Sequence, residues 1–81
     1  MMNLYAVFTE NTGNKISEGW IVMAKDEEEA KAKAVKEGES WHHPAKYTAT
    51  NAVFLRETVP SDTQAMEYLE VRYIYSWERD A

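Results

Sequence analysis

Residues 26–38 read DEEEAKAKAVKEG, and this stretch decides the fold more than any other. Asp26 suits a helix N-cap, and Glu29, three positions later, completes the capping-box pattern. The acidic first turn matches the positive end of the helix dipole, and Ala, Glu and Lys are strong helix formers. Gly38 is expected to end the helix in the C′ position. We therefore predict a helix over residues 26–37.

The apolar stripe of this helix is thin, since it consists of Ala30, Ala34 and Val35. Small side chains let a helix lie close to a sheet. They also remove little area from water, at about 25 cal/mol per Å². Most of the core is therefore expected to come from strands.

Strand-forming residues flank the helix on both sides, in residues 4–9, 19–24, 47–57 and 68–77. Turn formers around Gly13 join the first two strands in a hairpin. Residues 61–67 fit either a loop or a single helical turn. The order β-β-α-β-β predicts one α+β domain over residues 1–81, with a mainly antiparallel four-stranded sheet and one helix packed on one face.

The last strand alternates with period two, which predicts a common face for one set of apolar residues: Leu69, Val71, Tyr73, Tyr75 and Trp77. Residues 78–81 form a charged tail that is expected to fray. A helix of about eleven residues is roughly 16 Å long and cannot cover both faces of four strands. Both faces carry large apolar groups, so the second face is predicted to meet a partner or another copy. Cover by the chain's own loops is the alternative.

The composition excludes several classes of protein. The chain has 81 residues, 44% of them apolar, and no cysteine, so disulfides and most zinc sites are excluded. No apolar run approaches the roughly 20 residues that span a bilayer, and the first residues lack the pattern of a signal peptide. We expect a cytoplasmic protein.

The chain is acidic, with 9 Lys and Arg against 14 Asp and Glu and a net charge of -5. Such a charge repels phosphates, which argues against direct binding to nucleic acid or to anionic membranes. It favours a basic protein partner, including a protein that itself binds nucleic acid. A role in solubility alone is the alternative.

No catalytic or cofactor motif is present. The chain has only three glycines and lacks a glycine-rich phosphate loop. His42 and His43 are adjacent, and in an extended backbone their side chains point to opposite sides, which disfavours a shared metal ion. We therefore expect no catalytic residue, no cofactor and no metal, and hence a protein that is not an enzyme.

Partner contacts are expected from three places: the acidic helix start, the loop after the helix, and the sheet aromatics. Loops often carry function, and Trp is enriched at interface hot spots. The candidate residues are Asp26, Glu27, Glu28, Glu29, Trp41, His42, His43, Tyr73 and Tyr75.

One further pattern concerns the order of the elements. A strand that begins near Asn3 and a second strand over residues 20–24 lead into the Asp-led, Ala- and Lys-rich helix, and two more strands follow. This plan resembles that of small phage proteins, including some anti-CRISPR inhibitors of type I surveillance complexes. The resemblance implies stoichiometric inhibition by blocking a nucleic-acid-binding protein, and it assigns no functional residue. The expected function is a non-enzymatic protein-binding module that inhibits a host defence or nucleic-acid-handling complex. A homodimeric structural or accessory protein is the alternative.

Overall fold

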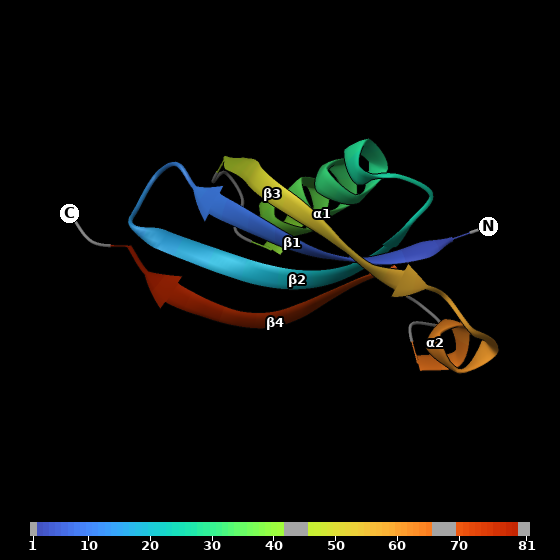
Figure 1. Cartoon of the computed structure of the whole chain (residues 1–81). Coiled ribbons are helices and arrows are strands. Elements are labelled where there is room, and N and C mark those ends of the chain that lie inside the picture. The colour runs from blue at the N-terminus through green and yellow to red at the C-terminus, as the bar shows by residue number, and fades with distance from the viewer. Residues whose placement is uncertain (1, 42–45, 66–69, 80–81) are drawn as a thin grey trace.

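The computed structural model of the chain describes residues 2–41, 46–65 and 70–79 (Figure 1). The predicted fold is confirmed: a four-stranded antiparallel sheet carries one helix, α1, on one face. The hairpin strands are longer than predicted. For residues 61–67, where the sequence fits a loop or a helical turn, the structure shows a short helix, α2 (Pro60–Ala65), and residues 66 and 67 lie outside the described part. The elements are β1 (Asn3–Asn11), β2 (Ile16–Ala24), α1 (Glu27–Trp41), β3 (Tyr47–Glu57), α2 (Pro60–Ala65) and β4 (Val71–Glu78).

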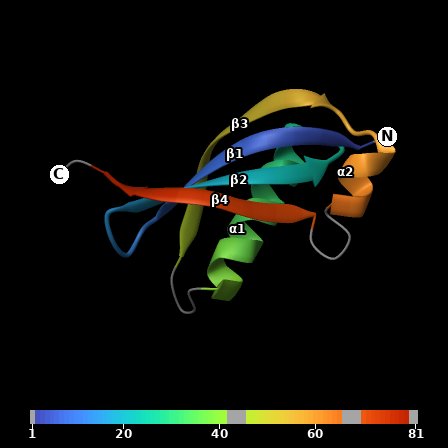
Figure 2. The same cartoon turned by 90° about the horizontal axis from the view of Figure 1, so that it is seen from below.

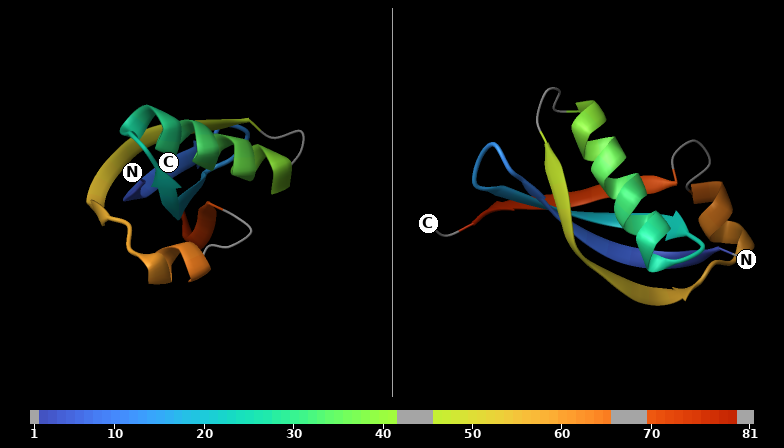
Figure 3. Two further views of the ribbon diagram at one scale, coloured as in Figure 1. Left: turned by 90° about the vertical axis from the view of Figure 1, so that its right-hand side faces the viewer. Right: turned by 90° about the horizontal axis from the view of Figure 1, so that it is seen from above.

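The strand order is β3-β1-β2-β4, so the first hairpin forms the centre of the sheet and the last two strands form its edges (Figures 1 and 2). All three pairings are antiparallel. On the face toward α1, Tyr5 and Val7 pair with Val22 and Trp20 and form the middle of the core. We call the opposite side of the sheet the far face. Helix α2 lies on this side, at the end where β1 begins (Figure 3).

Helix α1 lies across the sheet on a stripe of very small residues, Ala30, Ala34 and Gly38, all of which are buried (Figure 3). The predicted alanine contact is thus confirmed. The predicted helix end at Gly38 is wrong, because α1 continues to Trp41. The ring of Tyr47 packs against Gly38 so closely that an added Cβ would lie 2.9 Å from it. Glycine is therefore needed here for close approach inside the helix and not for a turn.

The helix start follows the prediction with one difference. The Asp26 carboxylate accepts a hydrogen bond of 2.8 Å from the Glu29 amide, as an N-cap does. The Glu29 carboxylate, however, accepts from the amide of Lys25 at 3.2 Å. This hydrogen bond, together with Lys33 at 3.3 Å, lowers the pKa of Glu29. Lys33 also donates to the Met23 carbonyl, which ties α1 to the end of β2.

The common face predicted for the last strand is confirmed for Val71 and Tyr73 but wrong for Tyr75 and Trp77, because β4 contains a β-bulge; Leu69 lies outside the described residues. Trp20 pairs with Tyr73, whereas its neighbour Gly19 pairs with Tyr75, so one residue of β4 is extra. A bulge turns the side chains that follow it to the other face. Tyr73 therefore meets the ring of Trp20 on the α1 side, and Tyr75 lies over Gly19 on the far face.

The expected fraying of the tail is wrong for its first two residues. Glu78 belongs to β4, and the backbone amide of Arg79 donates to the Lys15 carbonyl at 2.6 Å. The Arg79 guanidinium donates to three further carbonyls around the β1–β2 turn, those of Ile16, Asn11 and Asn14. The chain end is therefore anchored to the turn through residue 79. Asp80 and Ala81 lie outside the described residues.

Helix α2 begins with a charge-assisted cluster that predicts a pH dependence. The Asp62 carboxylate accepts two hydrogen bonds of 2.7 Å from Arg56 and one of 2.8 Å from the Val59 amide. The Arg56 contact first, and then the amide, lower the pKa of Asp62 below its ordinary value of 3.8. A depressed pKa contributes stability above pH 3.8 that is lost as the pH falls through the folded-state pKa.

We therefore expect the Asp62 carboxyl signal, followed by NMR, to titrate below pH 3.8. In the Arg56→Met variant the midpoint should move up toward that value. An unchanged midpoint would show that Arg56 does not hold this carboxylate in solution.

Candidate functional site

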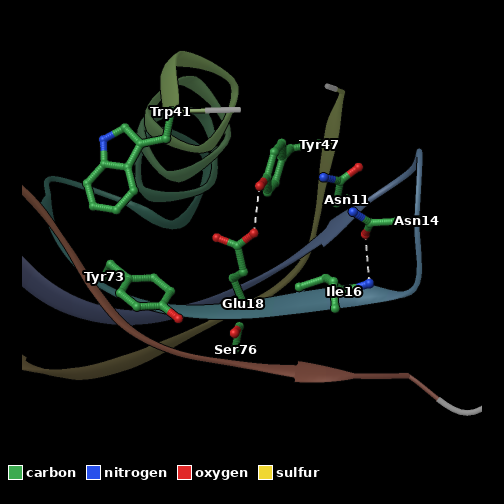
Figure 4. A pocket seen from close by; sticks show the side chains of 8 residues that line it. All are labelled: Asn11, Asn14, Ile16, Glu18, Trp41, Tyr47, Tyr73 and Ser76. Carbon is green, nitrogen blue, oxygen red and sulfur yellow. Dashed lines mark hydrogen bonds between the residues drawn. The ribbon is translucent and has the colours of Figure 1, made fainter. Parts of the chain in front are cut away.

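A pocket of about 340 Å³ opens on the α1 side of the sheet, at the end of the molecule where α1 stops. Five elements meet there: the end of α1, the start of β3, the parts of β1 and β2 next to their turn, and β4 (Figure 4). Its wall includes Asn11, Glu18, Trp41, Tyr47, Tyr73 and Ser76. Acid, phenol and indole groups thus share one space.

Glu18 is the most unusual residue of the pocket, because it is a carboxylic acid of which only 3% is exposed. Its Oε1 accepts a hydrogen bond of 2.6 Å from the Tyr47 hydroxyl. Its Oε2 is buried and has no hydrogen-bond partner among the residues that the structure describes. In Figure 4 the carboxyl group points into the space between the side chains of Trp41, Tyr47 and Tyr73. One carboxyl oxygen is therefore held in place without a donor.

Tyr47 fixes the other oxygen. Burial first, and then the hydrogen bond to Glu18, raise the pKa of Tyr47 above its ordinary value of 10. The phenol therefore keeps its proton and remains a donor at neutral pH. Because its ring rests on Gly38 of α1, the Tyr47 hydroxyl cannot move away from Glu18 easily. A buried oxygen without a donor costs free energy, so this arrangement is not the one that stability alone would favour.

Three aromatic rings stand beside this acid. The ring centroids are 5.9 Å apart for Trp20 and Trp41, 5.6 Å for Trp20 and Tyr73, and 6.0 Å for Trp41 and Tyr73. The Trp20 indole donates to the Thr9 hydroxyl at 2.8 Å and is buried. The Trp41 indole donates to Glu37 at 2.7 Å, but 51% of Trp41 is exposed. The cluster thus has a fixed inner member and an outer member at the surface.

A second surface of interest lies on the far face. We define the far-face patch as Phe8, Val53, Tyr75 and Trp77. The Tyr75 and Trp77 rings stack at 5.2 Å, and Phe8 meets Trp77 edge-on at 6.2 Å. Tyr75 is 49% exposed, Trp77 38% and Val53 43%.

The far face is covered at one end only. At the end where α2 lies, Leu4 and Met23 are buried. At the other end the far-face patch is open to solvent. The expected apolar second face is thus present, and the described segments leave Val53, Tyr75 and Trp77 of the patch exposed.

The structure separates the nine candidate residues. Trp41 and Tyr73 meet at the pocket, but Tyr75 lies on the opposite face. Asp26 and Glu29 are engaged in capping their own helix. The remaining acids, Glu27 and Glu28, are exposed at the other end of α1, and His42 and His43 lie outside the described residues.

Sequence reasoning missed Glu18 and Tyr47. The predicted second strand began at Gly19, which left Glu18 in the preceding loop. A signal was available: Glu18, Trp20 and Val22 share one phase of the alternation, and two of them are large apolar residues. An acid in that phase is expected to face the core.

Neither a metal site nor a membrane-crossing helix is found in the described part of the chain. Within residues 2–41, 46–65 and 70–79, no three His, Cys, Asp or Glu residues come together in a way that could hold a metal ion. None of the helices described there combines the length and the apolar character needed to cross a membrane. Comparisons with protein-family models, with curated proteins and with solved structures found no match for this chain.

Proposed function

We propose that this chain is a non-enzymatic protein-binding module that binds a basic protein. The observation that carries the proposal is the far-face patch, in which stacked aromatic rings remain exposed to water. Exposed apolar clusters of this kind are typical of interaction surfaces. Tyr and Trp supply large contact areas and lose little conformational entropy on binding.

The charge of the chain supports a basic partner. With a net charge of -5, the protein attracts positively charged surfaces over a long range and repels acidic ones. Proteins that handle nucleic acid carry such basic surfaces. An acidic protein seated on one of them would compete with the nucleic acid phosphates. The proposed role is therefore an inhibitor of a nucleic-acid-handling complex, such as a host defence complex.

Affinity capture from cells that express the gene tests this proposal. The bait is the full chain, and it is compared with a Tyr75→Ser/Trp77→Ser variant. Phe54→Ser is the matched control, because Phe54 is 51% exposed but lies on the α1 side of the sheet. We expect a basic protein to be recovered by the wild type and by the control, at least tenfold less by the double variant, and less in high salt. Equal recovery by all three baits would refute the role of the far-face patch.

The same exposed patch also favours a second candidate, a homodimeric structural or accessory protein. Sedimentation equilibrium separates the two candidates. A dimer mass that the Tyr75→Ser/Trp77→Ser variant converts to monomer would identify the patch as a subunit interface. A wild-type monomer at 100 µM, on the order of concentrations at which weak dimers form, would leave the surface for another protein.

A further inference from the structure

In the pocket around Glu18, one buried carboxyl oxygen lacks a hydrogen-bond donor among the residues that the structure describes. Among the described residues, no ion pair includes Glu18, and its Oε2 has no donor. Buried carboxylates in proteins are normally paired or fully hydrogen-bonded. The wall beside it consists of Trp41, Tyr73 and Tyr47. Indole and phenol rings attract cations through their electron-rich faces. Both features of the pocket select a positively charged ligand.

We propose that this pocket binds a primary alkylammonium group, which donates to Glu18 Oε2 while its alkyl stem lies against Trp41 and Tyr73. The inference goes beyond the proposed function. The pocket lies on the opposite side of the sheet from the far-face patch and requires neither that patch nor a protein partner.

The geometry distinguishes between kinds of cation. A guanidinium group prefers to bind both oxygens of a carboxylate at once, and Oε1 is already engaged by the Tyr47 hydroxyl at 2.6 Å. A quaternary ammonium group suits the rings but has no N–H to give to Oε2. A divalent metal needs several oxygen ligands, and this pocket offers one free carboxyl oxygen. The ammonium group, a compact donor with an apolar stem, satisfies both the acid and the rings.

Entry to the site depends on Trp41. Glu18 Oε2 is shielded from solvent in the closed arrangement, although Glu18 lines the pocket. Trp41 is the last residue of α1, is half exposed, and is held by one side-chain hydrogen bond to Glu37 within its own helix. A rotation of this indole would break its ring contacts with Trp20 and Tyr73 and open the way to the acid without moving the sheet. Access by movement of Trp41 is therefore part of the proposal.

The alkylammonium group that binds this pocket has two potential sources: the lysine side chain of a protein and a free amine. Titrations followed by two-dimensional ¹H–¹⁵N NMR on the full chain at pH 7 test the site and separate the sources. The probes are n-butylamine, n-butanol, butylguanidinium and tetramethylammonium at matched ionic strength, followed by a doubly blocked lysine and by a linear diamine. We expect saturable shifts of the Trp41 indole signal with n-butylamine, with a dissociation constant on the order of 1 mM for so small a ligand. The other three first-round probes should bind at least tenfold more weakly.

Glu18→Gln keeps the shape of the side chain and removes its charge, and it should weaken n-butylamine binding at least tenfold. Glu10→Gln removes an acid from β1 outside the pocket and should leave binding unchanged. Trp41→Ala removes a ring against which the alkyl stem lies and should also weaken n-butylamine binding at least tenfold, followed by the backbone amide of Glu18 because the indole signal is lost. Trp41 is half exposed and lies at a helix end, so this variant keeps the test decisive if Glu18→Gln fails to fold. Tighter binding of blocked lysine than of the diamine identifies a protein side chain as the source, and the reverse identifies a free amine. Equal shifts with butanol and butylamine, no saturable shift, or undiminished binding by Glu18→Gln would overturn the proposal.

Discussion

Replacing Trp20 with alanine is expected to lower the free energy of unfolding by about 3–5 kcal/mol, the usual cost of deleting a large buried aromatic ring. Trp20 is the largest fully buried side chain of the described residues, at 1% exposure. It meets the rings of Trp41 and Tyr73 and hydrogen-bonds to Thr9. The buried residues of α1 are only Ala30, Ala34 and Gly38, so the buried face of the helix has no large side chain to fill the cavity. Since small domains have stabilities of about 5–15 kcal/mol, the loss is a large share of the total.

Urea unfolding measures this loss, and two variants separate its causes. Trp20→Phe should destabilise the protein less than Trp20→Ala, because it keeps a ring in the core. It should still cost some free energy, because the buried Thr9 hydroxyl loses its donor. Trp77→Ala removes the same side chain type from a strand position that is 38% exposed, and should cost about 1 kcal/mol or less. If Trp77→Ala and Trp20→Ala destabilise the protein equally, the core is not where the structure places it.

The parts of the fold that the sequence predicts correctly are those determined by interactions between residues close together in the chain. The N-cap at Asp26 and the Ala30–Ala34 stripe depend on residues close together in the chain, and both are confirmed. Strand β3 has the predicted bounds because its composition and the flanking residues mark it locally. The prediction of the helix end was wrong because Gly38 is required for a contact with Tyr47. This residue follows nine positions later and packs on Gly38 from strand β3. A glycine that ends a helix and a glycine that admits a ring have the same local sequence.

The candidate site was less predictable than the fold, because strand register decides it. The bulge opposite Gly19 and Trp20 separates Tyr73 from Tyr75, and nothing in the alternation of β4 reveals it. Trp41 and Tyr73 were among the predicted partner contacts because aromatic residues are enriched at interface hot spots. Their common partner Glu18 was not, since its burial follows from the extension of β2 to Ile16. Glu18 and the three rings of Trp41, Tyr47 and Tyr73 come from four different elements, so they form one site only in the folded chain.

Replacing Arg79 with alanine is expected to cost about 2 kcal/mol, although this residue lies in a segment whose composition suggests a frayed tail. The guanidinium donates to the carbonyls of Asn11, Asn14 and Ile16 at 3.2, 2.6 and 2.7 Å. Hydrogen bonds from a charged donor contribute about 1.5–3 kcal/mol, and the partial exposure of these carbonyls keeps the sum from being larger.

The destabilisation should affect local opening of the β1–β2 turn more than unfolding of the whole sheet, because the three carbonyls belong to the hairpin around this turn. Hydrogen exchange should therefore accelerate at the turn in Arg79→Ala, while the amides of Val7 and Val22 in the centre of the sheet stay protected. Lys15→Ala is the matched control: it removes an exposed cation from the same turn and should leave both the exchange rates and the stability nearly unchanged.

Arg79→Lys keeps the charge of residue 79 without the planar guanidinium, and should recover only part of the stability lost in Arg79→Ala. If lysine restores full stability, a charged donor at residue 79 is sufficient and the planar geometry of the guanidinium does not matter. If it restores little, the guanidinium geometry holds the turn, and with it the Asn11 and Asn14 rim of the Glu18 pocket.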